Sequence, residues 1–331
     1  MLLFLGRRAA ESAVVLTVVT VAAFGMFRYV GDPVDLMLGE SADADARASL
    51  RSELRLDQPL PAQLGAFVGR LSHGDFGRSY RSGAPVAGLL VERAPATVEL
   101  ALFAMFLATL FGVPLGVWTA VHREGVASRF LESLALVGVS MPTFLTGVLL
   151  MFVFAVELQW LPAFGRGDVK TVGVWSTGLA TASGWKSIVL PALTLAWLQT
   201  ATIQRVVRDE MIETLDSDFI RFARVRGVGP VRLYVSHALR NAILPVITIG
   251  GVQFGSLVAF SLVTEAVFQW PGLGLLFVEA VNFADIPVMA AYLLVVAVMF
   301  VSINFFVDVL HVVLDPRLSH AWGARPETAR A

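Results

Sequence analysis

Residues 218–245 read DFIRFARVRGVGPVRLYVSHALRNAILP and lie between two long apolar runs. Only one of these residues, Asp218, is acidic. The stretch carries five arginines: Arg221, Arg224, Arg226, Arg232 and Arg240. Basic residues beside a membrane helix often only fix its orientation, but residues 205–241 form a longer charged segment than such an anchor requires. We therefore expect this stretch to have a structure and a role of its own.

The stretch is predicted to form two short helices with a break between them. Phe219, Phe222 and Ala223 recur at helical spacing, which places an apolar edge beside the basic residues. The sequence GVGP at 227–230 ends that helix, because glycine frees the backbone and proline blocks continuation. The apolar side of the second helix is expected to be Val231, Tyr234, Val235, Ala238 and Leu239. This pattern is typical of an element that docks on another protein. A helix lying on an anionic lipid surface is the alternative.

The composition of the 331-residue chain points to a membrane protein. Hydrophobic residues make up 56% of the sequence and charged residues 15%, whereas soluble domains carry about 25% charged residues. The mean hydropathy is +0.72. A net charge of −1 gives no reason to expect a nucleic-acid partner, and the absence of cysteine excludes disulfides and thiolate metal sites.

Long uncharged runs predict six transmembrane helices, since about 20 apolar residues cross a bilayer. The predicted spans are about 9–30, 97–121, 132–156, 187–207, 242–265 and 286–310. Four prolines lie in the runs or at their ends and predict kinks: Pro114, Pro142, Pro191 and Pro245. The uncharged runs contain no Asp or Glu, which argues against a proton-coupled secondary transporter.

The distribution of arginine predicts the orientation of the spans. Arg7 and Arg8 precede the first span, which we interpret as an uncleaved helix, while the loop at 265–285 has no basic residue. Both termini and the segment 208–241 are therefore expected in the cytoplasm, and the segment 31–93 outside it. The organisation is a single transmembrane domain, 1–320, followed by a disordered tail at 321–331.

The basic stretch resembles the cytoplasmic EAA loop of ABC-importer membrane subunits, in the branch that serves dipeptides, oligopeptides, nickel and glutathione. Its DFIRFARVRGV and HALRNAILP segments carry the likeness, although Arg221, Phe222 and Ala223 stand where the general pattern has Glu-Ala-Ala. Further motifs of that branch follow in order: GDPV at 31–34, LDQPL at 56–60, GDFGRS at 74–79, ATVEL at 96–100, SMPTF at 140–144, LPALT at 190–194, EAVFQWPGLG at 265–274 and DPRL at 315–318. The likeness thus runs over nearly the whole chain.

The resemblance implies a type I importer permease fold in a bacterial cytoplasmic (inner) membrane, surrounded by lipid. It implies a second related permease subunit, two ATP-binding subunits and an extracytoplasmic substrate-binding protein as partners. ATP and Mg would bind to the partner subunits, and this chain would bind no cofactor. The residues expected to couple to the ATP-binding subunits are Asp218, Arg221, Ala223, Arg224, Arg226, Gly227, Val228, Gly229, Pro230, His237 and Arg240.

Motifs for chemistry within the chain are missing. The sequence contains no GxxxxGK[ST] phosphate-binding loop, so ATP hydrolysis is expected on separate chains. The GRGD sequence at 165–168 matches a pattern of intramembrane aspartyl proteases, but Asp168 falls in a polar loop. No histidines pair at a spacing of four residues, so no metal site is predicted.

Four polar residues are candidates for lining a translocation path: Ser140, Gln199, Gln204 and Asn304. Hydrogen bonding between helices is the competing explanation for each of them. The function expected from the sequence is half of an import path for peptides or a similar small solute. The alternative is a stand-alone secondary transporter or channel, which would give the basic stretch no partner.

Overall fold

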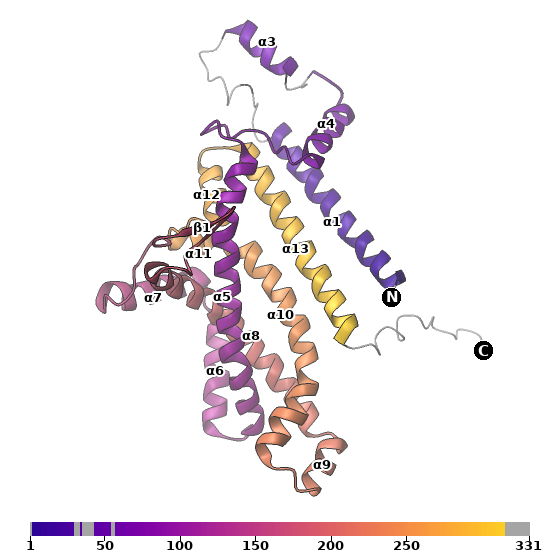
Figure 1. Cartoon of the computed structure of the whole chain (residues 1–331), viewed down its shortest axis with the longest axis vertical. Coiled ribbons are helices and arrows are strands. Elements are labelled where there is room, and N and C mark those ends of the chain that lie inside the picture. Colours follow the sequence, from indigo (N-terminus) through magenta and orange to yellow (C-terminus); the bar gives the residue numbers. More distant parts are fainter. Residues whose placement is uncertain (1, 30–33, 35–42, 54–56, 315–331) are drawn as a thin grey trace, which may run out of the picture.

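The computed structural model describes residues 2–29, 34, 43–53 and 57–314, and most of these are in helices (Figure 1). The predicted all-α class is therefore confirmed. The predicted tail at 321–331 and the DPRL motif at 315–318 lie outside the described residues.

The elements follow one another in a simple order. They are α1 (Leu2–Tyr29), α3 (Ala44–Glu53), α4 (Leu60–Ser72), α5 (Val86–Val121), α6 (Val126–Ser140), α7 (Thr143–Met151), the π-helix η1 (Phe152–Glu157), β1 (Lys170–Val172), β2 (Trp175–Thr177), α8 (Ala182–Leu215), α9 (Asp218–Val225), the π-helix η2 (Arg232–Leu239), α10 (Arg240–Phe260), α11 (Leu262–Val267), α12 (Leu273–Asn282) and α13 (Ile286–Leu314). The strands β1 and β2 pair as an antiparallel hairpin.

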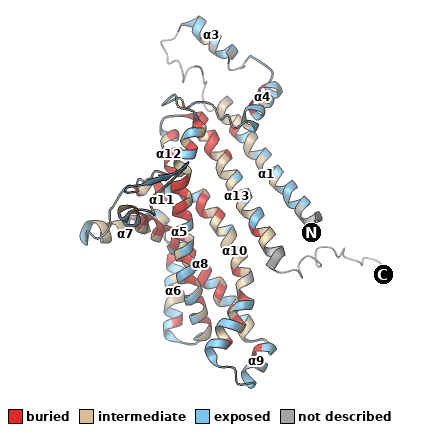
Figure 2. Ribbon diagram, in the orientation of Figure 1, coloured by how far each residue is buried: buried red, intermediate tan, exposed pale blue. Residues whose placement is uncertain are grey.

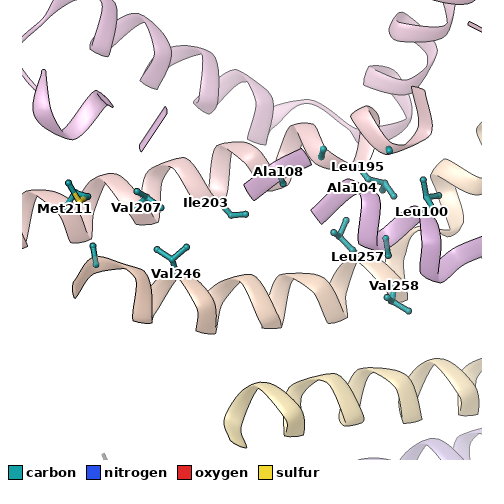
Figure 3. Packing of buried hydrophobic residues seen from close by; sticks show 14 of the residues in the cluster. Leu100, Ala104, Ala108, Leu195, Ile203, Val207, Met211, Val246, Leu257 and Val258 are labelled. Atoms are coloured by element: carbon teal, nitrogen blue, oxygen red, sulfur yellow. The ribbon is translucent and has the colours of Figure 1, made fainter. Parts of the chain in front are cut away.

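The centre of the bundle is the long contact between α5 and α8 (Figure 1). Small residues allow the two backbones to approach, because a Cβ on Gly116 would lie 2.6 Å from Val207 Cβ and one on Gly112 would lie 2.9 Å from Ile203 Cγ2. α10 packs against both helices, and α13 packs against α10. Buried aliphatic side chains from α5, α8 and α10, among them Leu100 and Leu257, fill the space between them (Figure 3).

Fewer described helices meet the requirements of a membrane span than the six predicted. Three are long and apolar enough: Gly6–Phe27, Val86–Val121 and Ile286–Leu310. Two bent pairs raise the number to five if each pair is one span. The predicted span 187–207 falls within α8, which is not among them, because its short apolar part runs on into charged turns.

The third predicted span, 132–156, is not one continuous helix. α6 ends at Ser140, α7 begins at Thr143, and the two are bent by 105°. Met141 between them has an extended backbone, with φ −81° and ψ 132°. A residue before proline is pushed out of the helical region by the proline ring, so Pro142 breaks the span where the sequence predicted only a kink.

The N-terminal helix lies at the edge of the bundle. α1 packs against α13 and α4, and many of its residues are exposed (Figure 2). Ala23 of α1, Phe67 of α4 and Leu294 of α13 form a small separate core there. The predicted outer segment 31–93 thus contains α3 and α4, and it also contains the first turns of α5, which starts at Val86 rather than at 97.

Candidate functional site

The basic stretch forms the far tip of the molecule, beyond the rest of the bundle (Figure 1). α5 has 36 residues and α8 has 34. At about 1.5 Å per residue such helices are about 50 Å long, whereas the hydrocarbon core of a bilayer is about 30 Å thick. The surplus length carries α9 away from the apolar part of the bundle. The predicted loop 208–241 accordingly includes the last turns of α8, the helix α9, and η2.

The helix breaks after α9 at the GVGP sequence from which the break was predicted. Gly227 has a φ of +78°, in the left-handed region that glycine enters without strain. Its N–H donates to Arg224 O at 3.0 Å, and Val228 N–H donates to Ala223 O at 3.2 Å. These two bonds are the Schellman arrangement that satisfies the last carbonyls of a helix. Pro230 is then the first residue of the next helical turns, a position at which proline is tolerated.

Three aliphatic side chains fix this tip to the bundle: Ile220, Leu233 and Ala238, which are 0%, 2% and 0% exposed. The predicted apolar faces were therefore wrong in part. Phe219 and Phe222 of α9 are exposed, because the neighbouring Ile220 is the residue that points into the core.

The same correction applies to the second helix of the tip. Val231 and Val235 are exposed, and Leu233, which the predicted face omitted, is buried. The helix is a π-helix, so its residues do not follow the spacing of 3.6 residues per turn on which the prediction rested.

The exposed surface of the tip mixes positive charge with apolar groups. All five arginines are exposed. The guanidinium of Arg226 lies 4.6 Å from the ring centre of Phe222, a cation–π contact. The exposed apolar side chains are Phe219, Phe222, Val225, Val231 and Val235. Aromatic and arginine side chains together are typical of the energetically important centre of a protein interface.

Acidic side chains line the last turns of α8 beside this basic tip. Arg123, in the turn after α5, pairs with Asp216 at 3.1 Å. One turn earlier, partial burial raises the pKa of the Glu210 carboxyl, and the neighbouring Glu213 and Asp209 raise it further. The tip therefore presents a basic surface next to an acidic one.

The opposite end of the molecule contains buried acids that the sequence analysis missed. Glu265 of α11 is 0% exposed. Its Oε1 accepts from Thr97 Oγ1 at 2.8 Å, and its Oε2 accepts from the backbone N–H groups of Gly274 at 2.7 Å and Leu275 at 3.1 Å. The carboxyl group thereby caps the first turn of α12 from outside that helix. The EAVFQWPGLG motif is the available signal in the sequence, because it contains both Glu265 and the glycines at the start of α12.

A second buried acid on α5 holds the β-hairpin. Glu99 Oε2 accepts from Arg166 Nη2 at 2.6 Å, and both side chains are 6% exposed. Trp175 Nε1 donates to Glu99 Oε1 at 3.1 Å, and Arg166 Nη2 also donates to the carbonyl of Ser176 at 2.7 Å. Asp168 lies in an exposed loop nearby, where it accepts a hydrogen bond from the hydroxyl of Ser183.

A third acid, Asp285, precedes α13 and is 3% exposed. It accepts from Ser79 Oγ at 2.5 Å and from Tyr80 N–H at 3.0 Å, which ties the GDFGRS segment to the end of α12. The uncharged runs contain no Asp or Glu, but the folded bundle nevertheless has buried acids, which weakens the argument against a proton-coupled transporter. Glu99 and Glu265 lie at the ends of uncharged runs in the sequence, and both are buried in the folded bundle.

The four candidate path residues are not brought together. Ser140 is exposed at the end of α6 and donates to Leu136 O, while Asn304 of α13 donates to Phe300 O at 2.8 Å. Gln199 is 5% exposed, and its side-chain oxygen has no hydrogen-bond partner among the described residues. Gln204 lines a pocket between α6 and α8. Among the described residues, no three His, Asp or Glu side chains are grouped so as to hold a metal ion.

The described chain is thus a bundle of apolar helices with an exposed, charged surface on a projecting end. The chain belongs to the family of inner membrane components of binding-protein-dependent transport systems, whose model matches residues 112–320. A second model, for the N-terminal part of the membrane components of such systems, matches residues 1–101. The protein is therefore a multi-pass component of the inner membrane.

Curated relatives match along nearly the whole chain. The dipeptide transport system permease protein DppB of Alkalihalophilus pseudofirmus is 38% identical over 333 residues, which cover 97% of this chain and 100% of that protein. A putative peptide transport system permease protein of Brucella abortus is 37% identical, covering 95% of this chain and 98% of its own length. The glutathione transport system permease protein GsiC of Salmonella paratyphi A is 38% identical, covering 88% and 90%.

Solved structures show the same fold at low sequence identity. A chain of the MetNI methionine ABC transporter, in an inward-facing conformation, matches with a TM-score of 0.55 and 19% identity. The match covers 69% of this chain and 96% of that one. The predicted type I importer permease fold is confirmed by this match together with the family.

Proposed function

We propose that this protein is one permease subunit of an ATP-driven importer for peptides or a similar small solute. It forms half of the translocation path and receives the conformational drive of ATP-binding subunits through the tip formed by residues 218–240. The curated relatives are permeases for dipeptides, peptides and glutathione. Their names support a substrate with peptide bonds.

The single observation that carries the coupling role is the exposed tip. Five arginines and two phenylalanines are held outside the bundle by three buried aliphatic anchors. A surface that combines exposed aromatic and basic side chains is typical of a site that binds a protein partner or a lipid headgroup layer. The length of α5 and α8 favours a protein partner, because those helices extend α9 beyond the thickness of a bilayer.

The partners follow from what the chain lacks and from the family to which it belongs. No phosphate-binding loop is present, so two ATP-binding subunits carry ATP and Mg and do the hydrolysis. A second, related permease subunit completes the path, and an extracytoplasmic binding protein delivers the solute at the end that contains α12 and the β-hairpin. Closure of the ATP-binding subunits moves the two tips together and switches the bundle between two access states.

Charge reversal at the tip tests this function. Arg226→Glu removes the contact with Phe222 and opposes an acidic partner surface, so peptide-stimulated ATP hydrolysis by the reconstituted complex should fall about tenfold or more. Arg70→Glu, on the exposed side of α4 at the other end of the molecule, is the matched control and should leave hydrolysis unchanged. Membrane insertion should be normal in both variants.

The purified complex gives the decisive measurement. Native mass spectrometry should find this chain with two ATP-binding chains and one similar membrane chain. A chain that purifies alone and transports without ATP would instead support the stand-alone transporter or channel. If Arg226→Glu retains normal ATP coupling, Arg226 is not at the contact with the ATP-binding subunits, but the importer function itself is not contradicted.

A further inference from the structure

The ends of α6 and α8 nearest the tip enclose a pocket that the coupling role does not explain. Its walls are Glu132, Ala135 and Leu136 of α6, and Gln204, Arg205 and Arg208 of α8, with Asp209 at the rim. On each helix these positions fall on one face, since they are spaced by one, three, four or five residues. The pocket therefore combines an apolar wall, a buried amide and charges of both signs.

The charges in the pocket neutralise one another in this structure. Arg208 Nε lies 2.8 Å from Glu132 Oε1, but its N–H does not point at that oxygen, so the contact is an ion pair without a hydrogen bond. Ser128 Oγ donates to the same carboxyl oxygen at 3.1 Å, and Arg208 Nη1 lies 3.6 Å from Asp209. The Arg208 and Glu132 side chains are 22% and 34% exposed, so a solute can reach both.

The pocket lies at the tip-side end of the span predicted at 187–207 within α8. α8 starts at Ala182, and about 20 residues are enough to cross the bilayer. Gln204 comes just after that length, and the helix then runs without interruption to the turn before α9. A single continuous helix therefore connects this pocket with the turn before α9.

We propose that the pocket binds the charged termini of a short zwitterionic peptide as it leaves the translocation path. Arg205 and Arg208 bind the C-terminal carboxylate, Glu132 binds the N-terminal ammonium group, and Gln204 bonds the amide between them. These groups are common to all short peptides, while Leu136 and the open rim accept different side chains. The inference rests on the proposed import of peptides and names the part of this chain that contacts the solute.

The ligand replaces an existing interaction and leaves no isolated charge. The Arg208–Glu132 pair opens when the two ends of a zwitterion take the place of its two members, so no charge is left without a counterion. A peptide that is acetylated at one end and amidated at the other lacks both charges and cannot make that exchange. Binding should therefore depend on free termini and hardly at all on side chains.

Site-directed photolabelling tests the proposal in the assembled complex without the binding protein, whose own specificity would otherwise enter. A benzophenone amino acid replaces Leu136 in the pocket or, as the matched control, the neighbouring Val137, which has a similar exposure and lies outside the pocket. The probe is a tritiated mixture of di-, tri- and tetra-alanine. The tritiated peptides should attach to the protein through position 136 and not through position 137. An excess of unlabelled peptides with free termini should prevent this labelling, and an excess of doubly blocked peptides should not.

Charge-neutral variants test whether the Glu132–Arg208 pair binds the peptide termini or only stabilises the packing of α6 against α8. Glu132→Gln with Arg208→Gln should reduce labelling about a hundredfold, since each of the two lost charged partners weakens binding by about tenfold. The control pair is Arg123→Gln with Asp216→Asn, which removes another ion pair at the same end and should not change labelling. If the Glu132/Arg208 double variant labels normally while the single variants do not, the pair is only structural and the proposal fails.

The outcomes distinguish this inference from the proposed function. Equal labelling at 136 and 137, or equal competition by blocked and unblocked peptides, would show that the pocket does not bind peptide termini. ATP-dependent peptide uptake by the same complex would still support the importer. Absence of ATP-binding chains from the purified complex, or uptake that does not need ATP, overturns the importer itself.

Discussion

Glu265 joins three parts of the molecule through one carboxyl group. Its donors come from α5, from α12 and from Ser261 just before α11. A buried carboxyl group is tolerated only when donors satisfy it, and here they include Thr97 of α5 and the backbone N–H groups of α12. A Cβ on Gly272 would collide with Glu265 Oε2 and Thr97 Oγ1, so the glycine of the motif makes room for the acid.

Removing this group should loosen the end that carries α12. Glu265→Ala leaves the N–H groups of Gly274 and Leu275 unpaired, at about 1–3 kcal/mol for each stranded donor. Glu265→Gln should have a smaller effect, because its oxygen still accepts. Thermal unfolding in detergent measures both, with Glu279→Gln, on the exposed part of α12, as the control. An unfolding temperature for Glu265→Ala equal to that of the control would contradict this role.

Glu210 should make stability depend on pH. Burial and the nearby Glu213 and Asp209 raise its pKa above the ordinary value of 4.5 in the folded protein, so the folded state disfavours its charged form. The contribution of Glu210 to stability is fully present below the ordinary pKa and is lost as the pH rises through the raised pKa. Glu210→Gln should therefore unfold at a higher temperature than the wild type at pH 7 and at the same temperature near pH 4. Exposed Glu124→Gln is the control, and a difference that grows on acidification would refute the sign.

At the scale of the elements, the packing of α5 against α8 depends on a close approach of their two backbones. Gly112 and Gly116 form a GxxxG pattern that faces Ile203 and Val207. Without side chains at these positions the helices interlock over a long contact, and this contact extends the tip away from the membrane. The bend between α6 and α7 is the other decisive element, since it removes α7 from the line of the bundle.

A single methyl group should disturb the contact between α5 and α8. A Cβ on Gly116 would lie 2.6 Å from Val207 Cβ and 2.7 Å from Gln204 O, and overpacking of this kind costs about 1–3 kcal/mol. Gly116→Ala should lower the unfolding temperature although alanine favours helix. Gly88→Ala, in the same helix with nothing within 4 Å of the added atom, should preserve or raise it. Equal behaviour of the two variants would exclude tight packing at Gly116.

At the scale of the whole molecule, α1 is an attachment to the body formed by α5, α8, α10 and α13. α1 contacts that body through α13. A bidentate ion pair fixes its start, with Arg8 Nε 2.9 Å from Asp308 Oδ2 and Arg8 Nη2 3.0 Å from Oδ1.

Breaking this pair should free the first turns of α1 without unfolding the body. The side chains are partly exposed, so the pair contributes only about 0.2–1 kcal/mol, and Arg8→Glu should speed hydrogen exchange at residues 2–11 by roughly two- to fivefold. Exchange should return toward the wild-type rate in Arg8→Glu with Asp308→Arg. Arg7→Glu is the control, because the contact of Arg7 is to Glu11 within α1. Failure of the double variant to restore protection would show that the pair does not hold the helix.

The sequence by itself determined that this is a helical membrane protein, that its basic stretch breaks at GVGP, and that it contains no GxxxxGK[ST] phosphate-binding loop. These are local properties, because hydropathy, glycine, proline and a missing phosphate loop act within a few residues. Tertiary structure alone decided that Glu99 meets Arg166 across 67 positions and that Glu265 meets Thr97 across 168. It also decided that Ile220 is buried while Phe219 and Phe222 are exposed, since the direction of a side chain depends on which helix lies beside it.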